Sequence, residues 1–388
     1  MRIKRSTTLL CAGLAASLVL AACGDADEPA DEPADVEDPA EEPEDVEEPA
    51  DEPEDVEEPA DEPVDDPAAD DGEQVAVGLV YDIGGRGDLS FNDAAAAGLD
   101  QAEAEFDLDT TELEPSEGGE NRDELLRLVS GEGVDLVFAV GFAFEEGLGS
   151  TAPDFPDVNY GLIDGFLPDL DADSNVVALG FAEHEGSFLV GAAAALKTEN
   201  NRVGFIGGVE IPLIERFEAG FIAGVEAVDP DIEIDRAYIS QPPDFGGFTD
   251  PAAGREIATG MYGNGADIVY HAAGGSGAGL FEAAREHSES TGDKVWAIGV
   301  DSDQYLTADE ELQEYILTSM LKRVDVAVYE TIVAQVEGRF EGGYRAFDLE
   351  TDGVGYATSG GFIDDIVDEL EELKAQVIAG DIVVPDAM

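Results

Sequence analysis

The feature that most constrains the fold is the alternation of short apolar runs with amphipathic stretches between residues 75 and 388. Each run is nearly continuous in hydrophobicity, as strands buried on both faces are. Amphipathic stretches such as 90–106 and 211–228 separate most of the runs. This order predicts an α/β fold with doubly wound parallel sheets. The runs are 75–83, 135–143, 158–165, 176–182, 202–209, 267–275 and 294–302.

The number of predicted strands exceeds what one modest sheet needs, so we expect two lobes in residues 75–388. The segment 181–196 passes directly from a strand into a helix rich in small residues, without a linker. We interpret it as the first crossing between lobes that share chain segments. The expected boundaries are 75–183 and 323–341 for lobe 1, and 184–322 and 342–388 for lobe 2.

Residues 1–23 have the plan of a secretory signal peptide, with a basic start, an apolar run and small residues at the end. The run is too short for a stable membrane span. Its end, "LAAC", resembles the bacterial lipobox, so Cys23 is expected to carry a lipid anchor at the extracytoplasmic face of the cell membrane. The alternative is a signal peptide that happens to contain a cysteine. The other cysteine, Cys11, precedes the expected cleavage site, so no disulfide is expected.

Residues 24–74 contain 27 Asp or Glu, no Lys or Arg, and a ten-residue repeat, "PEDVEEPADE". Such a segment is predicted to be a disordered, Pro-rich spacer, with receptor binding by the repeat as the alternative. The remaining chain, residues 75–388, is also acidic: it has 64 Asp or Glu and 15 Lys or Arg, a net charge of −49. This charge argues against nucleic acid and anionic lipid as partners. It also favours the hypothesis of adaptation to high salt.

Polar and glycine-rich segments follow four of the predicted elements. Asp82 ends the first strand, "SFND" (90–93) starts the next helix, and "GGSG" (274–277) and "DSDQ" (301–304) follow two later strands. Because ligands of such folds bind beyond the carboxyl ends of the strands, these segments predict a cleft between two facing sheet edges.

The segment "SFND" resembles a capping box, with Ser90 three residues before Asp93. This start would place Phe91 and Asn92 beside Asp82. An aromatic ring, an amide and a carboxylate suit a flat heterocycle that carries hydrogen-bond donors and acceptors. The alternative is that Phe91 packs in the core and Asn92 only begins the helix.

The glycine loops do not match a dinucleotide-binding pattern, because the third glycine is missing from both "GGRGDLS" and "AAGGSGAG". Asp301 and Asp303 end an apolar strand and could accept the hydroxyls of a vicinal diol. Lys322 could neutralise Asp301, bond to a ligand oxygen or form a structural ion pair. The main enzymatic alternative is a nucleoside or glycoside hydrolase that uses Asp82 and Asp301. No nucleophile-elbow, P-loop or zinc spacing accompanies them, so neither an enzyme nor a cofactor or metal is expected.

Several motifs together resemble the basic membrane protein (BMP) family of ABC-transporter substrate-binding lipoproteins, the purine nucleoside receptor A type. They occur in order after the lipobox: "VGLVYDIGGRGDLSFND", "FAEHEGSFLVGAAAAL", "VGFIGGVEIPLIERFEAGFIAGV", "GADIVYHAAGGSGAGLFEAA" and "AIGVDSDQY". The resemblance covers about residues 75–380. The acidic spacer lies outside it, and the strong acidity is unusual for the family.

The resemblance implies a type I periplasmic-binding-protein fold, with two doubly wound parallel-sheet lobes joined by crossover hinges and closing on a nucleoside. An ABC permease is the implied partner. Asp82 and Asn92 would bond the purine edge, Phe91 would cover one face of the base, and Phe248, or alternatively Phe217, the other. Gly275, Asp301 and Lys322 would hold the ribose. A sugar-binding or signalling lipoprotein of the same fold is the second alternative.

Overall fold

The computed structural model describes residues 74–116 and 118–388, which belong to one compact unit. The expected signal peptide, its Cys23 and all but the last residue of the acidic spacer lie outside the described residues. Within the described ranges, no helix is both long enough and apolar enough to cross a membrane.

The first of two six-stranded sheets has the order β11-β5-β4-β3-β1-β2, and all its neighbouring strands are parallel. Its inner strands are buried on both faces, which explains their continuous apolar sequence. We call this sheet and its helices lobe 1. The strands are β1 (Val75–Val80), β2 (Leu108–Leu113), β3 (Leu136–Val140), β4 (Asn159–Ile163), β5 (Val176–Phe181) and β11 (Gly343–Phe347).

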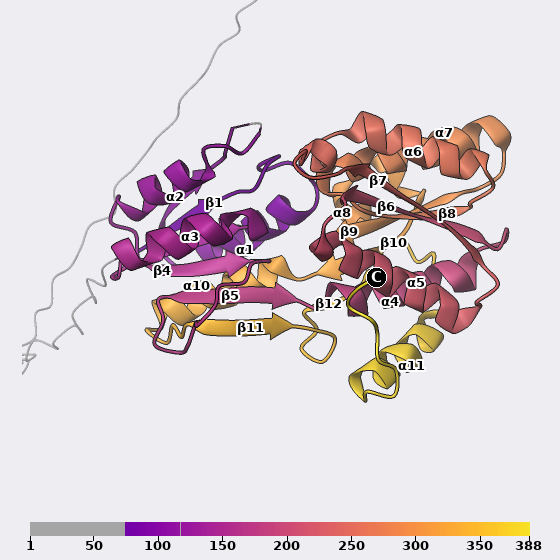
Figure 1. Ribbon diagram of the computed structural model, residues 1–388. Helices are drawn as coiled ribbons and strands as arrows, with labels where there is room; N and C mark the ends of the chain where they lie inside the picture. The colour runs from indigo at the N-terminus through magenta and orange to yellow at the C-terminus, as the bar shows by residue number, and fades with distance from the viewer. Residues whose placement is uncertain (1–73, 117) are drawn as a thin grey trace, which may run out of the picture. The chain divides into compact units, whose positions relative to one another are not determined.

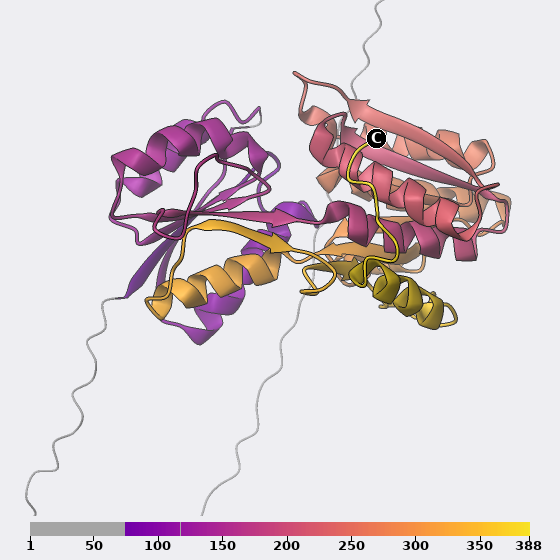
Figure 2. The same cartoon turned by 60° about the horizontal axis from the view of Figure 1, so that its bottom comes forward.

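Helices cover both faces of the first sheet, as Figure 2 shows with this sheet nearly edge-on. One face carries α1 (Phe91–Glu105) and α10 (Val324–Val336), and the other carries α2 (Arg122–Ser130) and α3 (Glu145–Thr151). The α1 helix approaches α10 closely because it is rich in small residues. A Cβ atom on Gly98 would lie 2.4 Å from the carbonyl oxygen of Asp325, so only glycine fits there.

The second sheet has the order β12-β10-β9-β8-β6-β7, parallel except for β12, which pairs antiparallel with β10. We call this sheet and its helices lobe 2. Its strands are β6 (Arg202–Val209), β7 (Glu233–Ser240), β8 (Ile268–Ala272), β9 (Trp296–Asp301), β10 (Ile316–Lys322) and β12 (Val354–Tyr356).

In lobe 2, α4 (Glu183–Lys197) packs on α5 (Pro212–Val228) on one side of the sheet. On the other side, α6 (Pro251–Gly263) packs on α7 (Gly277–Thr291), as Figure 1 shows. The C-terminal α11 (Val367–Ile378) contacts α4. Short turns of helix complete the lobes: α8 (Gln304–Thr307), α9 (Glu310–Gln313), η1 (Phe142–Phe144), η2 (Ala152–Asp154), η3 (Gly246–Phe248) and η4 (Gly274–Ser276).

The chain crosses between the lobes three times. The first crossing runs from β5 to α4 and the second from β10 to α10, close to the expected positions. The third was expected before residue 342, and this boundary is wrong. Because β11 pairs with β5 in the first sheet, the chain leaves lobe 1 only after Phe347 and joins the second sheet at Val354.

Candidate functional site

A pocket lies between the carboxyl ends of strands from both sheets. It takes residues that follow β1, β3 and β4 in lobe 1 and residues in or after β8, β9 and β10 in lobe 2. The space between its atoms is about 620 Å3, including its mouth, and about 70 Å3 of this can hold the centre of a water molecule. The pocket is therefore a narrow slot between the two lobes.

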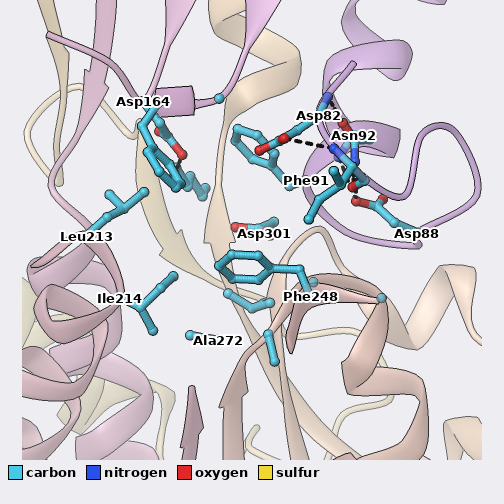
Figure 3. A pocket seen from close by; sticks show the side chains of 18 of the residues that line it. Asp82, Asp88, Phe91, Asn92, Asp164, Leu213, Ile214, Phe248, Ala272 and Asp301 are labelled. Atoms are coloured by element: carbon cyan, nitrogen blue, oxygen red, sulfur yellow. Dashed lines mark hydrogen bonds and ion pairs between the residues drawn. The ribbon is translucent and has the colours of Figure 1, made fainter. Parts of the chain in front are cut away.

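The structure brings all seven predicted ligand-binding residues to this pocket. All seven line it: Asp82, Phe91, Asn92, Phe248, Gly275, Asp301 and Lys322. Figure 3 shows Asp88 and Asn92 on one side of the pocket and Leu213 and Ile214 on the opposite side. The edge at which strands end thus gathers side chains that are more than 200 residues apart in the sequence. Their contacts with a ligand remain predictions.

The Asp82 carboxylate is held by an arginine that the sequence analysis missed. Arg122, at the start of α2, donates from Nε and Nη2 to Oδ1 of Asp82, at 3.0 and 2.5 Å. Burial raises the pKa of Asp82, and the Arg122 charge opposes this rise. The other oxygen, Oδ2, lies over Gly141, where a Cβ atom would come within 2.6 Å of it. Gly141 also has φ = 111°, a conformation that favours glycine.

The expected capping box at the start of α1 is wrong. Ser90 occupies the N-cap position, but its side chain makes no capping hydrogen bond. Asp88 takes that role: its Oδ1 accepts from the backbone N–H of Asp93, at 3.1 Å, and its Oδ2 accepts from that of Asn92, at 2.9 Å. The carboxylate of Asp93 instead accepts from the backbone of the preceding loop, at Gly87 and Leu89.

The same Asp88 orients the amide of Asn92. Asn92 Nδ2 donates to Asp88 Oδ2 at 3.0 Å, while Asn92 Oδ1 accepts from the backbone N–H of Asp82 at 3.0 Å. Burial raises the pKa of Asp88 to about 6, although three backbone N–H groups favour its charged form. The Asn92 amide is thus held by protein groups at Asp82, Ile83 and Asp88, and its contact with a ligand stays a prediction.

Phe91 and Phe248 are the partly exposed aromatic rings of the predicted base slot. Phe91 packs against the core, as the alternative expects, and it also lines the pocket, so its stacking on a ligand stays a prediction. Phe248 comes from η3 of lobe 2. Phe217, its rival, lines the pocket too but is only 3% exposed. A fourth ring, Phe142 after β3, lines the pocket and was not predicted.

Lys322 lies at the centre of a buried cluster of charges. Its Nζ atom is 2.5 Å from Asp164 Oδ2 and 3.2 Å from Glu183 Oε1. Phe91 and Phe217 face the ammonium group, with ring centroids 5.2 and 5.4 Å away. Burial opposes the positive charge, but the surrounding carboxylates outweigh it and raise the pKa of Lys322 above its ordinary value. Lys322 is therefore charged and joins the two lobes through Asp164.

Asp164, the residue after β4, is the main site residue that the sequence analysis missed. Burial raises its pKa to about 6, against the opposing charge of Lys322. Its Oδ1 is buried and accepts no hydrogen bond from any described residue. The signal that could have identified it was present, because Asp164 follows an apolar run, as Asp82 and Asp301 do. Glu183 could have been inferred only from the fold, since it lies inside a predicted helix.

The two carboxylates of "DSDQ", those of Asp301 and Asp303, lie in different places and have different partners. Asp301 lines the pocket and its Oδ2 accepts a hydrogen bond from Ser90 Oγ at 2.5 Å. Burial raises the pKa of Asp301, while Lys322 and Ser90 oppose this rise. Asp303 instead accepts from Ser359 Oγ at 2.6 Å, away from the residues that line the pocket. Among the described residues, no group of His, Cys, Asp and Glu could hold a metal ion.

Two α/β lobes with three crossings and a slot at the facing strand ends define the periplasmic-binding-protein class of solute-binding proteins. The comparisons agree with this class. A family model described as "ABC transporter substrate-binding protein PnrA-like" matches residues 75–388. The chain belongs to this family.

Relatives support the same family. A CD4+ T-cell-stimulating antigen of Listeria monocytogenes is 35% identical over 80% of this chain and 88% of its own length. The ABC transporter nucleoside-binding protein BmpA of Lactococcus lactis is 34% identical, over 79% of this chain and 88% of its own. The crystal structure of an ABC-transporter solute-binding protein from Aeropyrum pernix K1 matches with 31% identity and a TM-score of 0.69, over 80% of this chain and 94% of that chain. The protein is thus a substrate-binding protein of an ABC transporter.

Proposed function

We propose that the ligand of this substrate-binding protein is a nucleoside, with a purine nucleoside as the favoured type. The observation that carries the proposal is the pairing of aromatic rings with hydrogen-bond acceptors in one narrow slot. Phe91 and Phe248 come from different lobes and offer ring faces to a planar base. Stacking on aromatic side chains contributes about 1 to 3 kcal/mol per base.

The charges of the pocket favour a ligand that is neutral and rich in hydrogen-bond donors. Its lining includes four carboxylates and one ammonium group, from Asp82, Asp88, Asp164, Asp301 and Lys322. Carboxylates accept hydrogen bonds from hydroxyl and amino groups. A phosphate would meet this ring of like charges without a second lysine or an arginine in the lining, so we expect nucleotides to bind much more weakly than nucleosides.

In the proposed binding mode, Asp82 faces the donors of the base edge, while Asp301, Lys322 and the backbone at Gly275 face the ribose hydroxyls. A ligand held in this way contacts both lobes. It therefore favours the closed arrangement by its differential affinity, and the closed form would be the one that docks on the permease. The relative named as nucleoside-binding supports the ligand class.

We further propose that the protein acts at the extracytoplasmic face of the cell membrane, anchored by a lipid on Cys23. The "LAAC" sequence supports this anchor. The acidic segment 24–74 would then space the binding lobes from the membrane. A Cys23→Ser variant should lose incorporation of labelled fatty acid and appear in the soluble fraction. Retention of both label and membrane association would contradict the anchor.

Calorimetric titration of the full chain tests the ligand proposal. We expect heat of binding with inosine, guanosine or adenosine, and none with ribose, hexoses or inosine monophosphate at equal concentration. Chromatography of the same mixtures tests the hydrolase alternative, since release of free base would show cleavage. Binding of a sugar in the absence of nucleoside binding would replace the proposal with the sugar-binding alternative.

A further inference from the structure

A loop of lobe 1 forms direct hydrogen bonds with a loop of lobe 2 at the edge of the pocket. Ser90 Oγ donates to Asp301 Oδ2 at 2.5 Å, and Ser302 Oγ donates to the carbonyl oxygen of Ser90 at 3.2 Å. Next to them, Gln304 Nε2 donates to the carbonyl oxygen of Leu89 at 2.9 Å. We call these three bonds the interlobe latch. All three join protein atoms directly, so the latch needs no ligand atom to form.

Ser90 is unusual for a serine at a helix N-cap. A serine in this position normally uses its hydroxyl to cap the helix. Here Asp88 supplies the cap through its carboxylate, which leaves the Ser90 hydroxyl available for the other lobe. Ser90 is fully buried, and the preceding residue, Leu89, has φ = 56°, which is rare for a residue other than glycine. This geometry aims the hydroxyl and both carbonyls at lobe 2.

The lobe 2 side of the latch is held by hydrogen bonds within lobe 2. Gln304 Oε1 accepts from the backbone N–H of Val300 at 2.8 Å and lies 3.0 Å from Nε2 of the buried His271. These contacts fix the amide so that its Nε2 faces Leu89. Asp301 itself is placed by φ = 65° at the end of β9. The latch therefore joins a lobe 2 surface that is held by its own hydrogen bonds to a lobe 1 loop that is held by Asp88.

Loss of the Ser90 hydroxyl would affect Asp301 differently in the closed and in the open arrangement of the lobes. In the closed arrangement, Ser90 satisfies one oxygen of this buried carboxylate. In an open arrangement, water would take that place. Without the Ser90 hydroxyl, closure would bury a carboxylate oxygen that has lost its partner, which is unfavourable. Removal of the hydroxyl thus penalises the closed arrangement and leaves the open one almost unaffected.

We propose that Ser90 is a positioning residue, whose hydroxyl stabilises closure of the lobes and orients the Asp301 carboxylate toward the ligand. The part of this proposal that concerns the ligand rests on the proposed function. The part that concerns closure does not, because the three bonds join only protein groups.

The first test measures affinity in the full chain. Ser90→Ala should weaken binding of inosine about tenfold, mainly through faster dissociation, because a buried charged acceptor loses its donor. Ser302→Ala removes another bond of the latch and should give a smaller loss of the same sign. The matched control is Ser130→Ala, a buried serine whose hydroxyl bonds within lobe 1, to the carbonyl oxygen of Leu126. It should leave the affinity unchanged.

The second test measures closure without any nucleoside. In the full chain with Cys11 and Cys23 replaced by serine, fluorescent dyes are attached at Glu124→Cys on α2 and Glu256→Cys on α6, both exposed and in different lobes. We expect the population with the short interdye distance to fall in the Ser90→Ala variant and to stay unchanged in Ser130→Ala. An unchanged population would overturn the latch, whether or not inosine binds. If the unaltered chain does not bind inosine but its short-distance population still depends on Ser90, only the ligand proposal is overturned.

Discussion

Replacement of Lys322 by methionine tests the buried charge cluster at the centre of the pocket. The side chain of Lys322 is 2% exposed, and those of Asp164 and Glu183 are 5% and 1% exposed. Lys322→Met keeps most of the volume of the side chain and removes its charge. Asp164, Glu183 and Asp301 then share a site that water hardly reaches, and the cation that remains beside them is Arg216, whose Nη1 lies 3.6 Å from Glu183 Oε2 at the exposed edge.

The expected loss of stability is large because removal of one partner from a buried ion pair costs about 3 to 5 kcal/mol. For a folded unit of this size, that corresponds to a decrease in Tm on the order of 10 °C. An exposed pair gives a much smaller effect, typically below about 1 kcal/mol. Lys374 and Asp352 form such a pair, with 21% and 80% of their side chains exposed. Lys374→Met is therefore the matched control.

The loss should also depend on pH. Burial raises the pKa of Asp164 to about 6, above the 3.8 of an ordinary aspartate, so the folded state binds a proton more tightly than the unfolded state. The stability that comes from this protonation is fully present below pH 3.8 and is lost as the pH rises through 6. Without Lys322, the carboxylates repel each other most when ionised. The difference in Tm between Lys322→Met and the unaltered protein should thus be largest at pH 8 and smaller at pH 5.

Thermal unfolding followed by circular dichroism measures these differences at both pH values. A Tm of Lys322→Met within 2 °C of that of the control at pH 8 would refute the ion-pair argument. A loss that is equal at pH 8 and pH 5 would show that the carboxylates of the cluster do not carry the penalty.

Three further predictions concern the ligand slot, the helix cap and the surface. Phe91→Ala and Asp301→Ala should each reduce nucleoside affinity by more than about 1 kcal/mol in calorimetry. Leu128→Ala, at an exposed position on α2, should have no effect. If both variants bind the nucleoside as tightly as the unaltered protein does, neither residue belongs to the site. Asp88→Ala should lower the free energy of unfolding by about 1 to 2 kcal/mol, measured by urea titration, because α1 loses its cap; an unchanged midpoint would show that another group caps the helix. The net charge of −49 in residues 75–388 predicts a higher Tm in molar KCl than in dilute buffer, and a Tm that does not rise would count against salt adaptation.

The sequence predicted the inner strands of both sheets better than their edges. All seven apolar runs are strands, namely β1, β3, β4, β5, β6, β8 and β9. Of the five strands outside these runs, β2, β7, β11 and β12 lie at the sheet edges, and β10 is an inner strand. An edge strand is covered less completely, so its sequence is more polar: β2 reads "LDTTEL" and β7 reads "EIDRAYIS". The wrong boundary at residue 342 has the same origin, because it depends on the edge strand β11.

Much of the site could be predicted because parallel strands bring their carboxyl ends to one edge. That rule located Asp82 and Asp301, and it would also have located Asp164. It could not identify the partners of these carboxylates. Arg122, which bonds Asp82, and Glu183, which pairs with Lys322, both come from helices, and their positions depend on how those helices pack on the sheets.

The sequence alone determined the alternation of strands and helices, the two lobes and the residues that gather where strands end, because hydrophobic periodicity and chain order are local properties. Only the tertiary structure decided what each polar side chain bonds. Ser90 matches a helix cap in sequence, yet its hydroxyl reaches Asp301 in the other lobe, 211 residues away. Hydrogen bonds and ion pairs depend on distances of a few tenths of an ångström, and such distances are set by packing between segments that the sequence does not place side by side.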